Sequence, residues 1–248
     1  MDCNELFNSY YLKYLGISIQ EVHKEKKIFQ CSQRKKPINN CFFQHLIVTN
    51  IDGINTFSVT PKLYRDFSKY IIPFKNMETT ELFKVLRVFF DSRLEIYTIR
   101  EMYRMTLDIT YKRIPLQNSI VKLTKEIFIN NLQTVSEEEK QRIWLRKKDE
   151  VIQGRQYIIL DGNKIASYCK VSNIDYNGGN LTVYTNEKYR NKGYGKSVSI
   201  GAINWCIENE VIPVYWVDKK NMPSVALAKS LGFKIRSEEI VVGTNYQI

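Results

Sequence analysis

A short β-rich run, Leu181-Thr182-Val183-Tyr184-Thr185, precedes the segment Arg190-Asn191-Lys192-Gly193-Tyr194-Gly195, which opens a predicted helix. The two glycines of this segment let the backbone turn tightly and approach a ligand closely. The first N–H groups of a helix have no partner within the helix, and they favour an anion at that end. The segment therefore predicts an anion-binding turn between a strand and a helix, with Lys192 and Lys196 as additional positive charges.

The segments around this turn alternate between strand and helix patterns. We expect a helix at about residues 196–208, an apolar strand at 211–217, a second helix at about 221–231 ended by Gly232, and a last strand within 233–242. Strand, helix and strand at this spacing imply a right-handed parallel crossover, with ligands beyond the carboxyl ends of the strands. Taken alone, the turn is more typical of an ordinary strand-to-helix connection with an exposed basic face.

The sequence before this turn predicts two domains. A small N-terminal α/β domain is expected over residues 1–115, with strands near 28–31, 45–49 and 54–59, a hairpin turn at Asp52-Gly53, and helices at 63–71 and 82–90. A second domain is expected over residues 116–248. It would begin with one helix at 116–132 and a helix capped by Ser136, followed by a hairpin of 156–160 and 165–171 and a loop at 173–179.

Two ordered motifs resemble the GNAT N-acetyltransferase superfamily. Residues 183–195 resemble its acetyl-CoA motif, V-x-x-x-x-x-x-R/Q-x-x-G-x-G/A, and residues 213–233 resemble its second signature, which closes with Leu-Gly-Phe. The order of Pro213, Trp216, Asn221 and Ser224 before that ending is most similar to the zwittermicin A resistance subgroup. The resemblance covers about residues 116–248. It implies an α/β (α+β) fold in which a GNAT-like mixed central sheet is flanked by helices and preceded by the smaller N-terminal domain.

The same resemblance implies that acetyl-CoA is the co-substrate, that an amine is the acceptor and that no metal is required. The diphosphate would lie on the backbone amides of the turn, and the pantetheine arm would pair with residues 183–185 as an added strand. Asn221 would contact the cofactor or cap the last helix, and the same two readings apply to Ser224. The cofactor-binding residues so implied are Val183, Tyr184, Thr185, Arg190, Asn191, Lys192, Gly193, Tyr194, Gly195, Lys196, Asn221 and Ser224.

The catalytic residues are less well defined by the sequence. Acetyl transfer to an amine needs a base, a donor for the tetrahedral oxyanion and a proton for the departing thiolate. Many relatives have a carboxylate where this chain has Gly179-Asn180, and many have a Tyr where it has Ala228. The catalytic residues therefore stay unknown, with Asn180, Tyr215 and Ser224 as candidates. Asp175, Tyr168 and Glu187 are further polar groups for which a loop or surface position is the simpler interpretation, and Trp216 could line an acceptor pocket or belong to the core.

Composition narrows the remaining classes of function. The 248 residues are 44% hydrophobic, which is enough for a folded core. The net charge of +11 favours an anionic partner, but the basic runs are short and dispersed, so nucleic-acid binding is not expected. Five cysteines without a C-x-x-C pair favour the reduced cytoplasm, and we expect no membrane span, signal peptide or metal site. His23 lies among charges and is expected to be an exposed strand residue.

The leading hypothesis is a cytoplasmic N-acetyltransferase that acts on an amine of a small molecule. Amino groups of peptides or proteins form a related acceptor class. The main alternative is a non-catalytic module that binds acyl-CoA, motivated by Gly179-Asn180 and Ala228. The N-terminal domain would be a degenerate second copy of the fold or a lid over the acceptor. Because no R-x-x-G-x-G precedes residue 190, it is not expected to bind a second CoA in the same way. The oligomeric state stays unknown.

Overall fold

The structure is a computed structural model, in which residues 3–21, 27–38, 41–108, 112–117, 119–132 and 135–245 are described. The chain divides into two compact units. Unit 1 comprises Met1–Met105, Val217–Met222 and Ile235–Ile248, and unit 2 comprises Thr106–Trp216 and Pro223–Lys234. Both units combine helices with strands, which confirms the predicted α/β class. The single domain boundary expected near residue 115 stays a prediction, and His23 lies outside the described residues.

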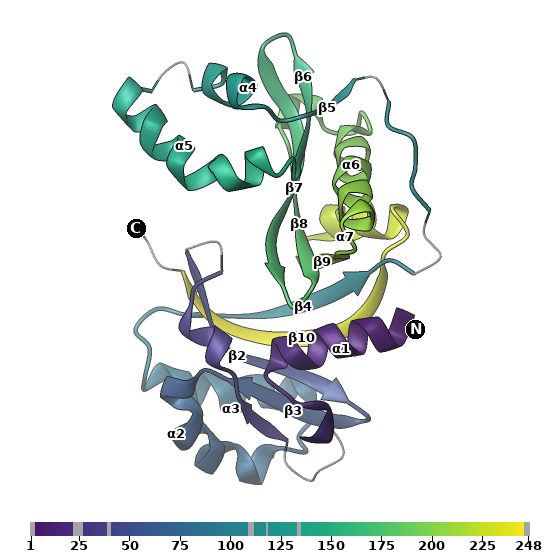
Figure 1. The fold of residues 1–248 in the computed structure, drawn as a ribbon. Coiled ribbons are helices and arrows are strands. Elements are labelled where there is room, and N and C mark those ends of the chain that lie inside the picture. Colours follow the sequence, from purple (N-terminus) through teal and green to yellow (C-terminus); the bar gives the residue numbers. More distant parts are fainter. Residues whose placement is uncertain are drawn as a thin grey trace. The chain divides into compact units, whose positions relative to one another are not determined.

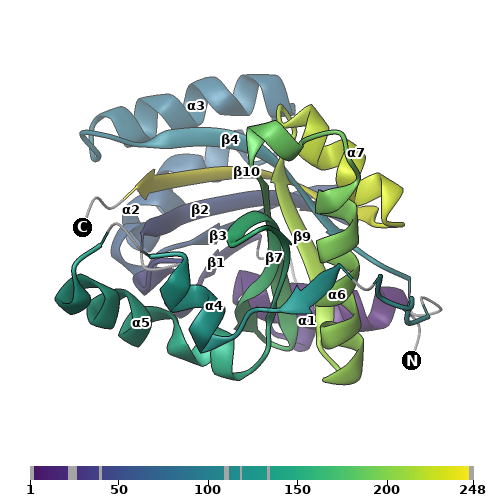
Figure 2. The ribbon, with the colours of Figure 1, turned by 90° about the horizontal axis from the view of Figure 1, so that it is seen from above.

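Unit 2 is built on a sheet whose antiparallel strands follow one another along the chain. They are β5 (Ile120–Lys122), β6 (Gln156–Asp161), β7 (Lys164–Asp175) and β8 (Gly178–Thr185), and β9 (Ile212–Asp218) then runs parallel to β8. Helix α6 (Tyr194–Glu208) covers one face of this sheet. Helices α4 (Lys125–Asn130) and α5 (Glu137–Ile152) lie on the other face, as Figures 1 and 2 show for α5. The short helix η4 (Glu187–Tyr189) follows β8, and α7 (Met222–Ser230) follows β9.

The alternation of side chains along β6 explains why α6 and α5 pack on opposite faces of the sheet. A Cβ on Gly201 of α6 would lie 2.4 Å from the Tyr157 ring, so Tyr157 points toward α6. The next residue, Ile158, packs with Leu123 and with Val151 of α5. Because successive side chains of a strand point to opposite faces, β6 holds α6 on one face of the sheet and α5 on the other.

Most elements predicted for unit 2 are confirmed, but two predictions are wrong. The β6–β7 hairpin, the Ser136 cap and the order of β8, α6 and β9 are as predicted. The helix predicted at residues 116–132 is wrong, because β5 pairs with β6 and α4 begins only after Thr124, whose hydroxyl caps it. The loop predicted at 173–179 is also wrong. Strands β7 and β8 extend to a tight turn at Tyr176 and Asn177, whose φ angles are 50° and 70°.

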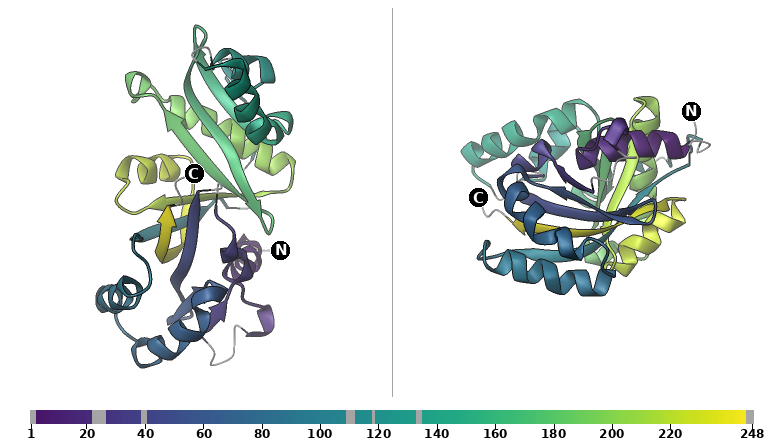
Figure 3. Two further views of the ribbon diagram at one scale, coloured as in Figure 1. Left: turned by 90° about the vertical axis from the view of Figure 1, so that its left-hand side faces the viewer. Right: turned by 90° about the horizontal axis from the view of Figure 1, so that it is seen from below.

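Unit 1 contains a sheet with the strand order β1-β3-β2-β10-β4. Its strands are β1 (Ile28–Gln30), β2 (Phe42–Ile51), β3 (Ile54–Val59), β4 (Thr98–Thr106) and β10 (Lys234–Asn245). Helices α2 (Pro61–Ile71) and α3 (Thr79–Asp91) lie on one side of the sheet and α1 (Cys3–Leu15) on the other, as Figure 3 shows. The predicted turn at Asp52 and Gly53 is confirmed, with φ angles of 52° and 80°. Short 3-10 helices at Ile19–Glu21, Ser32–Lys35 and Ile72–Phe74 connect these elements.

The two faces of the unit 1 sheet differ in chemistry. Leu46 and Val48 of β2 face an apolar cluster that includes Phe67 of α2 and Phe89 of α3. Thr49, one residue further, faces α1 and hydrogen-bonds to Ser237 at 2.7 Å. The α2 and α3 side is therefore the apolar core, whereas the α1 side is polar.

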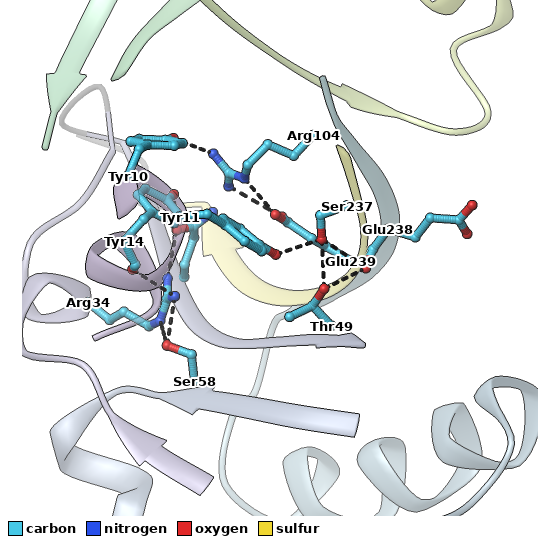
Figure 4. A network of polar contacts seen from close by, with 11 residues as sticks. Tyr10, Tyr11, Tyr14, Arg34, Thr49, Ser58, Arg104, Ser237, Glu238 and Glu239 are labelled. Atoms are coloured by element: carbon cyan, nitrogen blue, oxygen red, sulfur yellow. Dashed lines mark hydrogen bonds and ion pairs between the residues drawn. The ribbon is translucent and has the colours of Figure 1, made fainter. Parts of the chain in front are cut away.

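A buried polar network occupies the α1 side, as Figure 4 shows. Arg104 donates to the Glu239 carboxylate at 2.6 and 3.3 Å and to the Tyr10 hydroxyl at 2.9 Å. The Tyr11 hydroxyl hydrogen-bonds to Ser237 at 2.8 Å. The network thus joins α1 near the start of the chain to β4 and to β10 near its end.

Candidate active site

Strands β8 and β9 run side by side for only a short distance and then separate. Their parallel register joins residues 178–180 to residues 212–214. Gly179 permits this approach, since a Cβ there would lie 2.7 Å from Val171 and 2.8 Å from Val211. Strand β8 continues to Thr185, and in this fully described stretch its residues 181–185 have no partner in β9. The edge of β8 away from β7 is therefore open over these residues.

The open edge presents backbone hydrogen-bonding groups. The Asn186 N–H donates to the Ala166 carbonyl oxygen at 3.0 Å. This bond shows which residues of β8 turn their backbone N–H and C=O groups toward β7. In an antiparallel pair, every second residue turns its backbone groups toward the partner strand. The backbone groups of Tyr184 therefore point toward β7, and those of Val183 and Thr185 point toward the open edge. An extended ligand could pair there as a further strand.

The turn after β8 ends in the start of α6 and carries unpaired backbone donors. Asn191 and Gly193 lie in the left-handed region, with φ angles of 63° and 78°. The first hydrogen bond into the helix runs from the Ser197 N–H to the Gly193 carbonyl oxygen at 3.0 Å. Within the described part of the chain, the N–H groups of residues 193–196 have no acceptor. Such a row of donors at a helix start favours an anion.

The two glycines of the turn have different roles. A Cβ on Gly193 would meet nothing within 4 Å, so only its positive φ favours glycine there. A Cβ on Gly195 would lie 3.2 Å from Thr185 Oγ1 and 3.8 Å from Val183 Cγ1. Gly195 therefore lets α6 start close to β8. The same contacts place the Val183 and Thr185 side chains on the α6 face of β8, and Tyr184 between them on the opposite face.

The charged side chains of the turn are exposed and give it a positive balance. Arg190 lies 3.3 Å from Glu187, and both side chains are exposed, so this ion pair adds little stability. Lys192 lies 5.5 Å from the centre of the Tyr189 ring, and Lys196 is exposed. Tyr194 is half-buried and stacks on the Tyr189 ring. The turn thus brings the predicted basic residues and the backbone donors to one end of α6.

Two of the three catalytic candidates are hydrogen-bonded to each other. Tyr215 directly follows the last residue of β9 that pairs with β8, and its hydroxyl lies 2.9 Å from the Ser224 Oγ in α7. Tyr215 is 4% exposed. Burial raises the pKa of its hydroxyl above the ordinary value of 10.0, although the hydrogen bond with Ser224 acts in the opposite direction. The site therefore holds a protonated phenol where β8 and β9 separate.

The third candidate, Asn180, carries an unpaired buried acceptor. It is the last residue of β8 that pairs with β9, and its backbone carbonyl oxygen accepts from the Ser172 hydroxyl at 3.0 Å. Its side-chain Oδ1 is buried and has no hydrogen-bond partner among the described residues. Buried polar atoms are rarely left unpaired, because their desolvation is then uncompensated. This oxygen is available to an N–H group of a ligand.

The other sequence candidates are spread over both units. Asn221 belongs to unit 1, where its backbone N–H donates to the Asp218 carbonyl oxygen at 2.9 Å. Tyr168 packs against Tyr184, with ring centroids 5.5 Å apart. The remaining candidates are Asp175 at the end of β7, exposed Glu187 and half-buried Trp216.

Each unit also contains a pocket that the sequence motifs do not predict. The pocket of unit 2 measures about 320 Å³ and lies between α4, α5 and strands β6 to β8. The pocket of unit 1 measures about 330 Å³ and lies where β10 begins to pair with β2. Lys219 lines this pocket and donates to Glu238 at 2.6 Å and to Glu101 at 3.3 Å. Residues far apart in sequence line both pockets, so no local spacing could have indicated them.

The residues that the structure describes contain neither a cluster of metal ligands nor a helix suited to a membrane. Among these residues, no group of three or more His, Cys, Asp or Glu side chains is placed to hold a metal ion. None of the described helices has both the length and the apolar character needed to cross a membrane.

The sequence matches one family of known proteins. A model of the family GNAT acetyltransferase matches residues 66–241, which is more than half of the chain. The uncharacterized N-acetyltransferase YdfB of Bacillus subtilis (strain 168) is 35% identical over 85 residues, or 34% of this chain and 33% of YdfB. This match thus spans only a third of YdfB. The solved structure of a GNAT-family acetyltransferase from Colwellia psychrerythraea is 8% identical, and the alignment covers 100% of this chain and 98% of that one with a TM-score of 0.50. At that identity the likeness concerns the fold alone.

Proposed function

Because the chain belongs to the GNAT acetyltransferase family, we propose that it is an N-acetyltransferase that transfers the acetyl group of acetyl-CoA to an amine. The observation that carries this proposal is the open edge of β8 beside the unpaired N–H groups at the start of α6. One feature suits an extended amide-containing arm, and the other suits a diphosphate. Acetyl-CoA contains both groups in one molecule.

The residues proposed to bind acetyl-CoA belong to β8, to the turn and to the segment around the start of α7. The diphosphate would accept from the N–H groups of residues 193–196, with Lys192 and Lys196 adding charge. An exposed helix start contributes about 0.3 to 1 kcal/mol per anionic interaction, so several donors acting together are needed. The pantetheine arm would pair with the open edge at Val183 and Thr185. The remaining proposed contacts are Tyr184, Arg190, Asn191, Gly193, Tyr194, Gly195, Asn221 and Ser224.

The proposed reaction replaces the C–S bond of the thioester with a C–N bond. The neutral amine attacks the carbonyl carbon, and the Val183 N–H at the open edge donates to the oxyanion. Asn180 Oδ1 accepts one amine N–H and thereby orients the nitrogen, while the proton that the amine loses passes to solvent. Tyr215 donates its proton to the departing thiolate and regains one from solvent before the next turnover, and Ser224 holds the phenol hydroxyl in position.

The proposed acceptor is an amine of a small molecule, and amino groups of peptides or proteins are the related alternative. The likeness to the zwittermicin A resistance subgroup supports the small-molecule class. A second candidate function, binding of acyl-CoA without turnover, is favoured by one observation. Where many relatives have a carboxylate, this chain has Asn180, which cannot act as a base at neutral pH.

A pair of substitutions at Gly193 tests the cofactor site. Asp and Asn both tolerate the left-handed region better than other side chains, and a Cβ at this position meets no neighbour. Gly193→Asp places a negative charge beside the proposed diphosphate, whereas Gly193→Asn adds the same volume without charge. By calorimetric titration, we expect acetyl-CoA to bind the Asp variant at least ~10-fold more weakly than the Asn variant.

Each result of this titration has a definite meaning. Equal dissociation constants for the two variants, or no binding to the wild type, would contradict the proposed site. If the Asp variant does bind more weakly, release of free CoA that depends on added small amines would establish transfer. Tight binding of acetyl-CoA without acetylation of any amine, peptide or protein would instead favour the binding module.

A further inference from the structure

The pocket of unit 2, here called the α5 pocket, lies on the face of the sheet opposite to α6. Tyr168 and Tyr184 form its aromatic floor, with ring centroids 5.5 Å apart and ring planes tilted by 31°, and Tyr184 is 47% exposed. Leu123 and Phe128 contribute apolar wall. The hydroxyl groups of both tyrosines lack a hydrogen-bond partner among the described residues. The pocket thus offers two aromatic rings whose hydroxyl groups have no partner among the described residues.

The charges of the α5 pocket are not balanced. Lys170 lies 3.0 Å from the Glu150 carboxylate, and Lys147 lies 3.9 Å from the same carboxylate. Two ammonium groups therefore share one carboxylate; the side chains of Lys170 and Glu150 are 14% and 18% exposed, and that of Lys147 is 43% exposed. Burial and the neighbouring charge of Lys170 lower the pKa of Lys147. A further anion between the two lysines would relieve this repulsion.

The α5 pocket adjoins the strand at which transfer is proposed. Tyr184 lines the pocket from β8, and its neighbours Val183 and Thr185 point to the α6 face. Acetyl-CoA bound along the open edge of β8, with its diphosphate at the start of α6, would contact Tyr184 only from the edge of the strand and would leave the pocket side of the Tyr184 ring free. An amine that reaches the thioester from the Tyr184 face would lie next to the α5 pocket.

We propose that the α5 pocket binds the acetyl acceptor, and that this acceptor is an amine with an apolar ring or chain and a carboxylate held between Lys147 and Lys170. The proposal rests on the proposed function, since it names the acceptor class of the same reaction. The aromatic floor recognises the apolar body of the acceptor, and the unbalanced pair of lysines recognises its carboxylate. Glu150 holds Lys170 in place.

Binding of a simple probe tests the pocket without any turnover. The probe is 4-methylbenzoate, which carries the expected ring and carboxylate, and 4-methylbenzamide is its neutral counterpart. By calorimetry, we expect the benzoate to bind at least ~5-fold more tightly than the amide. Lys147→Met keeps the apolar stem and removes the charge, so it should abolish this preference. Lys148→Met changes the next lysine of α5, which does not line the pocket, and should leave it intact.

A second measurement links the pocket to the acceptor. With acetyl-CoA present, kcat/KM for 4-(aminomethyl)benzoate should exceed that for 4-(aminomethyl)benzamide at least ~10-fold, and Lys147→Met should remove the difference through KM. Absence of benzoate binding, binding that Lys147→Met does not weaken, displacement of benzoate by acetyl-CoA, or equal turnover of the two amines would each overturn the inference. The acetyl-CoA titration of the Gly193 variants is a separate readout, so failure of the proposed function is recognised independently.

Discussion

Tyr215 is the proposed proton donor to the departing thiolate. It is buried where β8 and β9 separate, and its hydroxyl hydrogen-bonds to Ser224. We predict that Tyr215→Phe lowers kcat about 10-fold to 100-fold, because the departing thiolate loses its proton donor. The dissociation constant of acetyl-CoA should stay unchanged, and the unfolding free energy should fall by only about 1 kcal/mol for the lost hydrogen bond. Steady-state kinetics and calorimetry on the same preparations measure these quantities.

The pH profile and a control variant give a second test of this role. An acid acts only while it is protonated, and burial keeps the pKa of Tyr215 above 10.0. Loss of activity through Tyr215 deprotonation therefore lies above pH 10, and below that pH the variant should show a lower but parallel profile. Tyr157→Phe, which removes another buried phenol hydroxyl of unit 2, is the control. A similar loss of kcat in that variant would argue against Tyr215 as the acid.

Residue roles were predictable where they depend on neighbours in the chain, and not where they depend on contacts across the fold. The spacing of Gly193 and Gly195 indicates a tight turn, and the structure has one. The spacing cannot tell that Gly193 is needed for its φ angle and Gly195 for contact with Thr185. Nor could it predict the bond between Tyr215 and Ser224, which lie in a strand and a helix nine positions apart.

At the scale of elements, the longer periodic segments were predictable and the short ones were not. Helices α2 and α3 repeat apolar residues over several turns, so the sequence indicates them directly, and α6 is indicated by the glycine turn before it. Strand β5 has three residues, too few to show a period of two, and the apolar residues around it favour the single helix predicted at 116–132. Strand β4 contains Arg104, whose burial depends on Glu239 in a distant strand. Because β4 contains such polar residues, its sequence does not show the apolar pattern of a buried strand.

The packing of α6 on β6 gives a prediction at this scale. A Cβ on Gly201 would lie 2.4 Å from Cδ1 of the Tyr157 ring, so the helix can approach the strand only without a side chain there. We predict that Gly201→Ala lowers the unfolding free energy by about 1 to 3 kcal/mol through overpacking. This loss exceeds the gain of up to about 1 kcal/mol that alanine brings to a helix interior. Urea unfolding of the variant measures the difference.

A double-mutant cycle identifies the cause of that loss. Tyr157→Leu removes the ring that the new methyl group would strike, at its own cost for the lost packing. If the clash is the cause, Gly201→Ala should cost less in the Tyr157→Leu background than in the wild type, by at least about 1 kcal/mol. Strictly additive effects would show that the glycine is required for another reason.

At the scale of the whole molecule, a helix near the start of the chain, α1, and a strand near its end, β10, contact each other in unit 1. Tyr11 of α1 and Ser237 of β10 are 226 positions apart and share a hydrogen bond of 2.8 Å. The sequence motifs end near residue 233, so they could predict a last strand but not its partner β2. For the same reason α1 was not predicted, since its polar contacts lie on residues that only the complete fold brings together.

The ion pair of Arg104 and Glu239 gives the prediction that belongs to this scale. The two side chains are 3% and 0% exposed, and they connect β4 to β10 below α1. We predict that Glu239→Ala lowers the unfolding free energy by about 3 to 5 kcal/mol, because it leaves the Arg104 charge buried without its carboxylate. Glu238→Ala is the matched neighbour: its side chain is 62% exposed and pairs with Lys219, so it should cost at most about 1 kcal/mol.

The double variant Arg104→Met/Glu239→Leu removes both charges and should recover at least about 2 kcal/mol of the loss seen in Glu239→Ala. If it unfolds as readily as the single variant, the network stabilises unit 1 through its tyrosine and serine hydrogen bonds and not through the compensation of a buried charge.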